Sequence, residues 1–125
     1  MSDNTESGGT AHGLNAFHPA MSASVLRDLD SVMTEVAEWI KDTAGCFLGH
    51  VKMAVTEGNR TMTLNLTDLG TGVEHHGSLA DDVRVEIRFM AAVVDVDHGE
   101  LAERMRNALT SKGFKLKNRN IIELE

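Results

Sequence analysis

The positions of the hydrophobic residues after residue 20 repeat with the period of a helix. Five of them share one helical face: Val25, Leu29, Val32, Val36 and Ile40. Apolar residues that recur three and four positions apart form the buried stripe of an amphipathic helix. Ser22 or Ser24 can cap the first turn, and Gly45 supplies a stop. The pattern predicts a helix between these residues.

A period of two follows this helix. Residues 47–56 alternate between apolar and polar side chains, residues 57–60 have the composition of a turn, and residues 61–67 alternate again. Alternation places apolar side chains on one face of a strand, and two such runs joined by a short turn form a hairpin. Residues 83–94 also alternate but are apolar on both faces from Met90 onward. We therefore predict a hairpin and a central strand.

A second helix is predicted to begin at Asp97. Asp97 and Glu100 match the D-x-x-E variant of the capping box, and Gly113 is a stop. Residues 114–116 and 121–124 predict a last edge strand. The expected order is α-β-β-β-α-β. Two helices on one face of a mainly antiparallel sheet bury both apolar stripes at once, so we expect an α+β two-layer sandwich, ferredoxin-like or related.

The composition changes sharply at about residue 20. Residues 1–20 are rich in Ser, Gly, Thr, Asn and Ala and show no sustained periodicity. Such a segment buries too little apolar surface to offset its loss of conformational entropy. We expect a disordered N-terminal tail over residues 1–20 and a single α+β domain over residues 21–125. The final Leu124-Glu125 resembles a cloning remnant and receives no functional weight.

The charge and the cysteine content narrow the class of protein. A formal net charge of -7 disfavours nucleic acid as a partner, because its backbone is bound by clustered Lys and Arg. The longest apolar run, Phe89 to Val94, is far too short to span a bilayer. The single cysteine excludes an intrachain disulfide, and the N-terminus lacks a secretory pattern. We expect a cytoplasmic protein with no membrane association.

The segment between the second and third predicted strands is the first candidate site. Residues 69–82 exceed the length that a hairpin connection needs, and they carry Glu74, His75 and His76 between two glycines. One carboxylate and two imidazoles are competent ligands for a divalent transition metal such as zinc. A solvated polar loop is the alternative, and the residue pattern alone favours it.

The start of the first predicted strand is the second candidate. Cys46 and His50 lie on one face of an ideal strand, about 13 Å apart at roughly 3.3 Å per residue, too far to share a metal unless the strand bulges. Gly45 and Gly49 permit a bulge or a close backbone approach. A buried structural cysteine beside an exposed histidine is the favoured interpretation.

The two candidates can also combine. If residues 69–82 fold back over the first strand, His50 joins His75 or His76, and Glu74 or Cys46 supplies a third metal ligand. No tight ligand spacing such as C-x-x-C or H-E-x-x-H supports this set.

Catalytic motifs are absent from the sequence. There is no P-loop and no G-x-S-x-G elbow, and Cys46 has no identifiable base. Asp95, Asp97 and His98 could serve acid–base chemistry, but helix capping explains Asp97 more simply. We assign no catalytic residue.

Residues 46–109 resemble a known family of small domains. The segment Leu48-Gly49-His50-Val51-Lys52, the hairpin, the strand over residues 83–94 and the helix from Asp97 are similar to the C-terminal domain that follows the GTPase in some CobW-type proteins. Those proteins are implicated in metal or cobalamin handling. The GTPase domain is missing here with its P-loop and cysteine metal motif, so neither hydrolysis nor that metal site is implied. The resemblance implies an accessory module that acts beside a separate enzyme.

Three functional hypotheses follow. The first is a non-catalytic binding or interaction domain that docks a protein partner, or another copy of itself, through the sheet face around His50 and Lys52 or through an edge strand. The second is a metal-binding accessory protein that uses His50, His75 and His76. The third is a small-molecule enzyme with a pocket near His50, in which His50 acts as an acid or a base.

Overall fold

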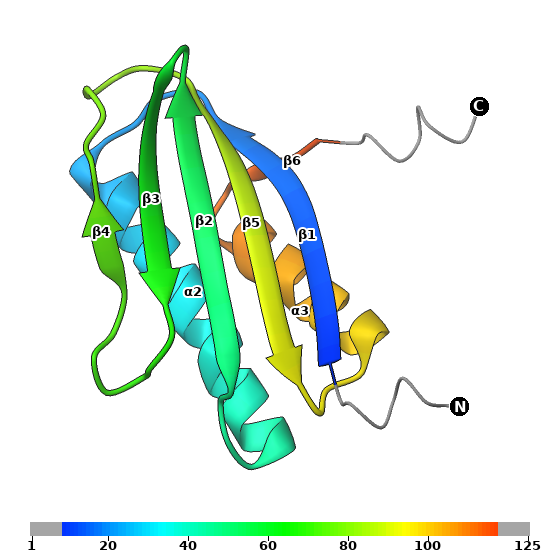
Figure 1. Ribbon diagram of the computed structural model, residues 1–125. Coiled ribbons are helices and arrows are strands. Elements are labelled where there is room, and N and C mark those ends of the chain that lie inside the picture. Colours follow the sequence, from blue (N-terminus) through cyan, green and yellow to red (C-terminus); the bar gives the residue numbers. More distant parts are fainter. Residues whose placement is uncertain (1–8, 118–125) are drawn as a thin grey trace.

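The structure is a computed structural model of the 125-residue chain, and it describes residues 9–117. Two helices lie behind one face of a six-stranded antiparallel sheet (Figure 1). The elements in chain order are β1 (Gly9–His18), α2 (Ala23–Ala44), β2 (Gly49–Glu57), β3 (Arg60–Leu66), β4 (Glu74–His76), β5 (Val85–Val94), α3 (His98–Ser111) and β6 (Lys115–Leu116). The prediction of an α+β fold with two helices and an antiparallel sheet is confirmed.

The strand order explains the two-layer architecture. The sheet runs β4-β3-β2-β5-β1-β6, with every described pair antiparallel. The units β1-α2-β2 and β5-α3-β6 interleave in the sheet, which is the split β-α-β arrangement of a ferredoxin-like sandwich. The strands β3 and β4 extend the sheet beyond β2. Figure 1 shows α2 and α3 side by side behind the sheet.

Both helices begin and end at the predicted caps. The Ser22 hydroxyl accepts a hydrogen bond from the Val25 amide, and Gly45 ends α2 in the left-handed conformation with φ of 90°. The Asp97 carboxylate accepts a hydrogen bond from the Glu100 amide at 2.9 Å at the start of α3. These groups satisfy backbone donors and acceptors that a helix end leaves without partners. The sequence signals therefore located both helices correctly.

The prediction of a disordered tail over residues 1–20 is wrong for residues 9–18. These residues form β1, which pairs along its whole length with β5, from Gly9 opposite Val94 to His18 opposite Val85. Ala16 is fully buried. The apolar signal is weak because small residues face away from the helices, and the strand is specified by pairing with β5 rather than by its own hydrophobicity. The domain therefore includes β1, and residues 1–8 lie outside the described residues.

Two smaller differences concern the ends of the predicted strands. Part of the predicted loop over residues 69–82 forms β4, which pairs with the edge of β3. The last strand is confirmed at β6, whereas its second predicted piece, residues 121–124, lies outside the described residues, as does the Leu124-Glu125 dipeptide.

One core lies between the sheet and the helices. The central strand β5 directs alternate side chains toward the helices, and these are buried: Val85, Ile87, Phe89, Ala91 and Val93. They contact the buried stripe of α2 in a single cluster. Within residues 9–117, neither helix has the length and apolar character needed to cross a membrane.

Candidate functional site

Neither helix covers the sheet face opposite α2 and α3, which the elements in residues 9–117 leave open (Figure 1). Residues paired across neighbouring strands point to the same face, so the register identifies the side chains on this open face. On β1, β5 and β2 they are Ala11, Gly13, Asn15 and Phe17 of β1, Glu86, Arg88, Met90, Ala92 and Val94 of β5, and His50, Lys52, Ala54 and Thr56 of β2. One end of this face is apolar and the other is charged.

The apolar end contains a hollow of about 450 Å³. Its lining residues are Gly9, Thr10, Ala11, Leu48, Gly49, Ala92, Val93 and Val94. Small side chains on β1 leave room for the hollow, and Leu48 beside it is 56% exposed. A large apolar side chain left in water next to an apolar depression is a common feature of a docking surface. We call this region the apolar hollow.

Gly49 builds one wall of the apolar hollow by a close backbone approach. Its φ is 123°, and a Cβ atom at this position would lie 2.1 Å from the Ala92 carbonyl oxygen and 2.9 Å from the Val93 Cα atom. Only glycine fits between β2 and β5 here. The close approach that the sequence suggested for Gly49 therefore occurs, at the first residue of β2 and next to Leu48.

Five basic side chains lie on the open face between its middle and its charged end, and we call them the basic cluster: Lys52, Arg84, Arg88, Lys115 and Lys117. Two carboxylates, Glu74 and Glu86, lie on the same face. The face therefore has a net charge of +3, and the rest of a chain with net charge -7 carries -10. A second hollow of about 280 Å³ lies between Asn15, Thr56, Glu86, Arg88 and Lys117.

Glu86 organises part of the basic cluster. It accepts a hydrogen bond from the Lys117 ammonium at 2.8 Å and bonds from the Arg84 guanidinium at 3.2 and 3.3 Å. The Arg84 guanidinium also stacks over the Phe17 ring, 4.1 Å from its centroid. The hydrogen bond from Lys117 is the main cause that lowers the pKa of Glu86, with Arg84 contributing. Glu86 on β5 thus holds the residue that follows β6 across the open face.

Substituting Lys117 with methionine is expected to raise the pKa of Glu86 toward its usual value. Because the folded-state pKa of Glu86 is lowered, the ion pair stabilises the fold above the usual carboxyl pKa, and this contribution is lost as the pH falls through the folded-state pKa. Both side chains are about half exposed, so the loss is expected to stay below about 1 kcal/mol. Carboxyl-carbon NMR titration of wild type and variant measures the shift. An unchanged Glu86 pKa would contradict the pairing.

The hypothetical convergence of His50 with the histidines of residues 69–82 does not occur. The His75 ring faces the helices, with its Nε2 2.7 Å from the Asp30 carboxylate of α2. His76 and Glu74 point to the open face on β4, two strands away from His50 on β2. The antiparallel pairing of β4 with β3 holds these residues at the sheet edge instead of folding them over β2. Among residues 9–117, no three His, Cys, Asp or Glu side chains are grouped to hold a metal ion.

Cys46 is exposed, so the interpretation of a buried structural cysteine is wrong. It lies in the short connection between α2 and β2, just after the Gly45 cap, where the chain has left the core. His50 is exposed, as predicted. His50 adjoins the apolar hollow through Gly49, but the residues that line this hollow include no titratable side chain.

A pair of histidines that the sequence did not suggest lies at one end of the helix layer. His12 Nδ1 is 3.2 Å from His98 Nε2, and the two rings meet edge to face with centroids 5.0 Å apart. Burial is the main cause that lowers the pKa of His12, and the nearby His98 and Arg106 add to it. The pair was missed because residue 12 was assigned to the tail; only the antiparallel pairing of β1 with β5 brings it to α3.

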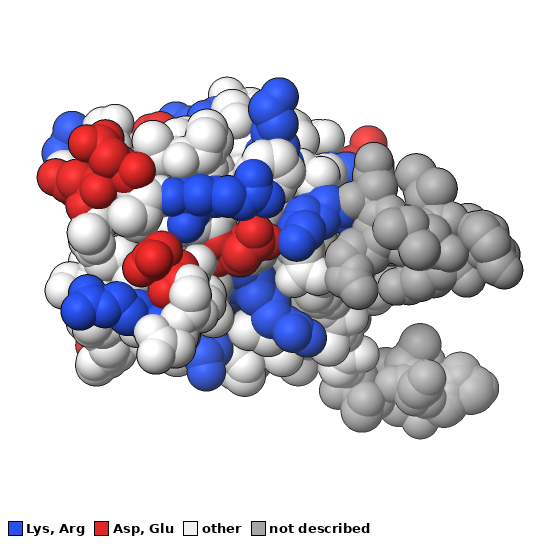
Figure 2. Space-filling model, turned by 90° about the horizontal axis from the view of Figure 1, so that it is seen from above, with Lys and Arg blue, Asp and Glu red and all other residues white. Residues whose placement is uncertain are grey.

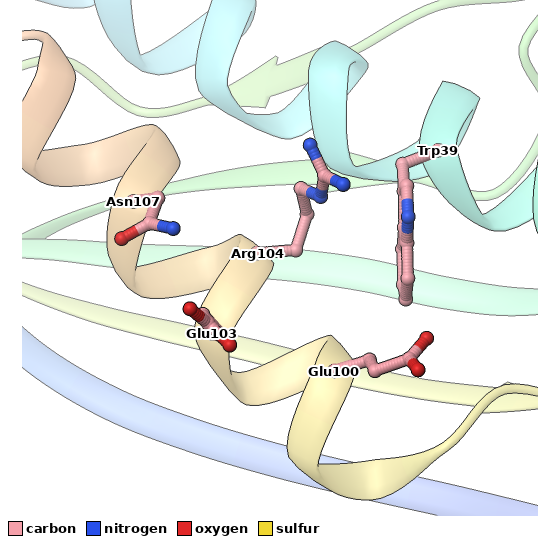
Figure 3. Close-up of a pocket in the computed structure, with 5 residues that line it drawn as sticks. All are labelled: Trp39, Glu100, Glu103, Arg104 and Asn107. Carbon is pink, nitrogen blue, oxygen red and sulfur yellow. The ribbon is translucent and has the colours of Figure 1, made fainter.

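A shallow groove of about 290 Å³ lies on the outer surface between α2 and α3. Figure 3 shows Trp39 projecting from α2 toward α3, which contributes Glu100, Glu103, Arg104 and Asn107. The Arg104 guanidinium carbon lies 5.3 Å from the centroid of the Trp39 ring, a cation–π contact. The contact between Arg104 and Trp39 therefore fills part of the groove, and the carboxylates of Glu100 and Glu103 are exposed to solvent.

The end of the molecule viewed in Figure 2 carries mixed charges. Acidic and basic side chains lie next to one another there, without a continuous basic surface.

The comparisons with known proteins give one distant structural match. No protein-family model matches the chain, and no curated protein sequence matches it. A crystal structure of a Zn(II)-bound triple mutant of the YjiA GTPase, a CobW-family GTPase, is similar with a TM-score of 0.42 and 8% sequence identity. The match covers 81% of this chain and 30% of the YjiA chain, so this chain spans less than a third of that protein's length. A similarity of this size does not assign this chain to the CobW family.

Proposed function

We propose that this chain is a non-catalytic binding domain whose open sheet face docks an acidic protein partner. One observation carries the proposal: the apolar hollow with its exposed Leu48 and the basic cluster lie on the same uncovered face. A net charge of +3 on this face, against -10 on the rest of the chain, complements an acidic partner and disfavours stacking two open faces of the same chain against each other.

The two ends of the face would make different contributions to binding. Full burial of a leucine side chain contributes about 1.5–3 kcal/mol, so Leu48 is expected to supply affinity. The basic cluster would chiefly raise the association rate and select acidic surfaces, because exposed charges steer encounter more than they add net affinity. The partner expected is therefore a protein segment in which apolar side chains alternate with carboxylates.

Two observations favour a protein partner over a nucleic acid or a small-molecule substrate. A sheet that binds single-stranded nucleic acid presents exposed aromatic rings for base stacking, whereas Phe17 on this face is covered by Arg84. Among residues 9–117, Thr10 is the one polar residue that lines the apolar hollow, and the register directs its side chain to the helix layer, where its hydroxyl donates to the Val96 carbonyl oxygen at 2.9 Å. General acid–base chemistry needs a titratable group within hydrogen-bond reach of the substrate.

The test uses defined probes. A fluorescein-labelled peptide in which glutamate alternates with leucine and valine is titrated with the full chain, and fluorescence anisotropy gives the Kd. The Leu48→Asp variant is expected to weaken binding at least about tenfold, the effect of losing roughly 1.4 kcal/mol. Asn107→Asp adds the same charge on the helix layer and is the matched control, for which we expect an unchanged Kd.

Three results would overturn the proposal. One is equal binding by wild type and Leu48→Asp. A second is preference for the same peptide with lysine in place of glutamate, or for a single-stranded oligothymidine. The third comes from sedimentation of the free chain: a dimer that Leu48→Asp dissociates would identify a second copy of the chain as the occupant of this face.

A further inference from the structure

His12 and His98 are held close together by two elements that are distant in the sequence. His12 lies on β1 opposite Ala91 and points to the helix layer, while His98 is the first residue of α3. The backbone around His98 is anchored by the Asp97 cap and by the hydrogen bond from the Thr10 hydroxyl to the Val96 carbonyl oxygen. Both imidazoles therefore project from anchored backbone and not from a free loop.

The separation of the two ring nitrogens matches that of two ligands on one metal ion. His12 Nδ1 and His98 Nε2 are 3.2 Å apart. A tetrahedral zinc ion with Zn–N bonds of about 2.0–2.1 Å separates two ligand nitrogens by roughly 3.3 Å. We propose that His12 and His98 form a two-imidazole site for a divalent transition metal ion, with water completing the coordination. This site is separate from the open sheet face and does not depend on its proposed function.

Some of the charges around the pair oppose a bound cation and others favour it. Arg106 faces His12, and the positive end of the α3 dipole lies at His98, so both oppose a bound cation. Asp95, Asp97 and Glu100 lie within three residues of His98 and offset that charge. Because the site has two protein ligands and the nearby positive and negative charges offset each other, it is expected to bind zinc reversibly.

Zinc titration of the full chain tests the proposal. Isothermal titration calorimetry after treatment with a chelator is expected to show one zinc ion per chain. His12→Ala and His98→Ala should each weaken binding at least about tenfold, because loss of even outer-shell partners of a metal costs 10–100-fold. His50→Ala is the matched control and should bind as wild type does. Arg106→Met should bind roughly two- to fivefold more tightly, the effect of one partly exposed charge.

Histidine ring NMR supplies the second readout. On zinc addition, the resonances of His12 Nδ1 and His98 Nε2 are expected to shift to metal-bound values, while those of His50 stay in place. Since His98 is exposed, His98→Ala should melt like wild type without metal, which separates a lost ligand from a lost fold. Absence of stoichiometric binding, or binding abolished by a His75→Ala/His76→Ala double substitution but not by His98→Ala, would overturn the proposal. Leu48→Asp should leave the zinc affinity unchanged.

Discussion

Replacing Ala16 with aspartate is expected to lower the free energy of unfolding by several kcal/mol. Ala16 is fully buried on β1, opposite Ile87 and against the core. An unpaired carboxylate at this position loses its hydration, at an effective cost of several kcal/mol, and a domain of this size is stable by only about 5–15 kcal/mol. Urea unfolding followed by circular dichroism measures the loss.

The neighbouring residue is the matched control for this substitution. Asn15 is half-buried on the open face opposite Arg88, so Asn15→Asp introduces the same charge one residue away, outside the core and beside a cation. Its effect on the free energy of unfolding is expected to stay within about 0.5 kcal/mol, as for most surface substitutions. Equal stability of the two variants would contradict the packing of β1 in the core and would restore the interpretation of residues 9–18 as a tail.

Replacing Gly49 with alanine is expected to destabilise the domain by about 2 kcal/mol or more. The φ of 123° at this position strains any other residue, and such backbone strain alone costs of order 1–3 kcal/mol. The added Cβ would also lie 2.1 Å from the Ala92 carbonyl oxygen, so β2 and β5 must separate. The same separation would change the apolar hollow and weaken binding of the acidic peptide.

A Gly58→Ala variant in the turn between β2 and β3 separates the backbone strain from the steric clash. Its φ is 62° and a Cβ atom there would meet no atom within 4 Å, so Gly58→Ala introduces the conformational cost of about 1–2 kcal/mol without a clash. Thermal unfolding of both variants gives the comparison. If Gly49→Ala proves no more destabilising than Gly58→Ala, the close approach of β2 to β5 at Ala92 is incorrect.

The helices and the hairpin could be predicted because each carries its own local signal. Ser22 and Gly45 bracket α2, Asp97 begins α3, and the alternation over residues 47–67 with a turn at Gly58 specifies β2 and β3. These signals depend on backbone groups and side chains within a few residues of one another, so they can be recognised in the sequence without knowledge of the tertiary structure.

The strand β1 could not be predicted because its stability is not local. Gly13 contributes no side chain to the open face, and the helix-facing positions include His12 and His18, so alternation of apolar and polar residues is absent. The ten backbone pairings with β5 determine its conformation. Because β1 was not predicted, the full strand order, the β1 wall of the apolar hollow and the His12–His98 pair were not predicted either.

The candidate metal ligands show the limit of assigning sites from residue type. Glu74, His75 and His76 are adjacent in the sequence, but pairing of β4 with β3 sends His75 toward Asp30 and the other two to the opposite face. Adjacent residues on a strand alternate sides, so they cannot converge as they could in a loop. The basic cluster could not be predicted from the sequence either, because its members are spread over residues 52 to 117 of an acidic chain.

Amide chemical-shift mapping of the bound peptide tests the proposed docking face most directly. A two-dimensional ¹H–¹⁵N spectrum of the full chain is recorded as the unlabelled peptide of alternating glutamate, leucine and valine is added. We predict that the largest shifts fall at the apolar hollow and the adjoining sheet, around Ala11, Leu48, His50 and Ala92, and that Leu48→Asp removes them. Shifts confined to α2 and α3, or an unchanged spectrum at saturating peptide, would contradict binding through the open face.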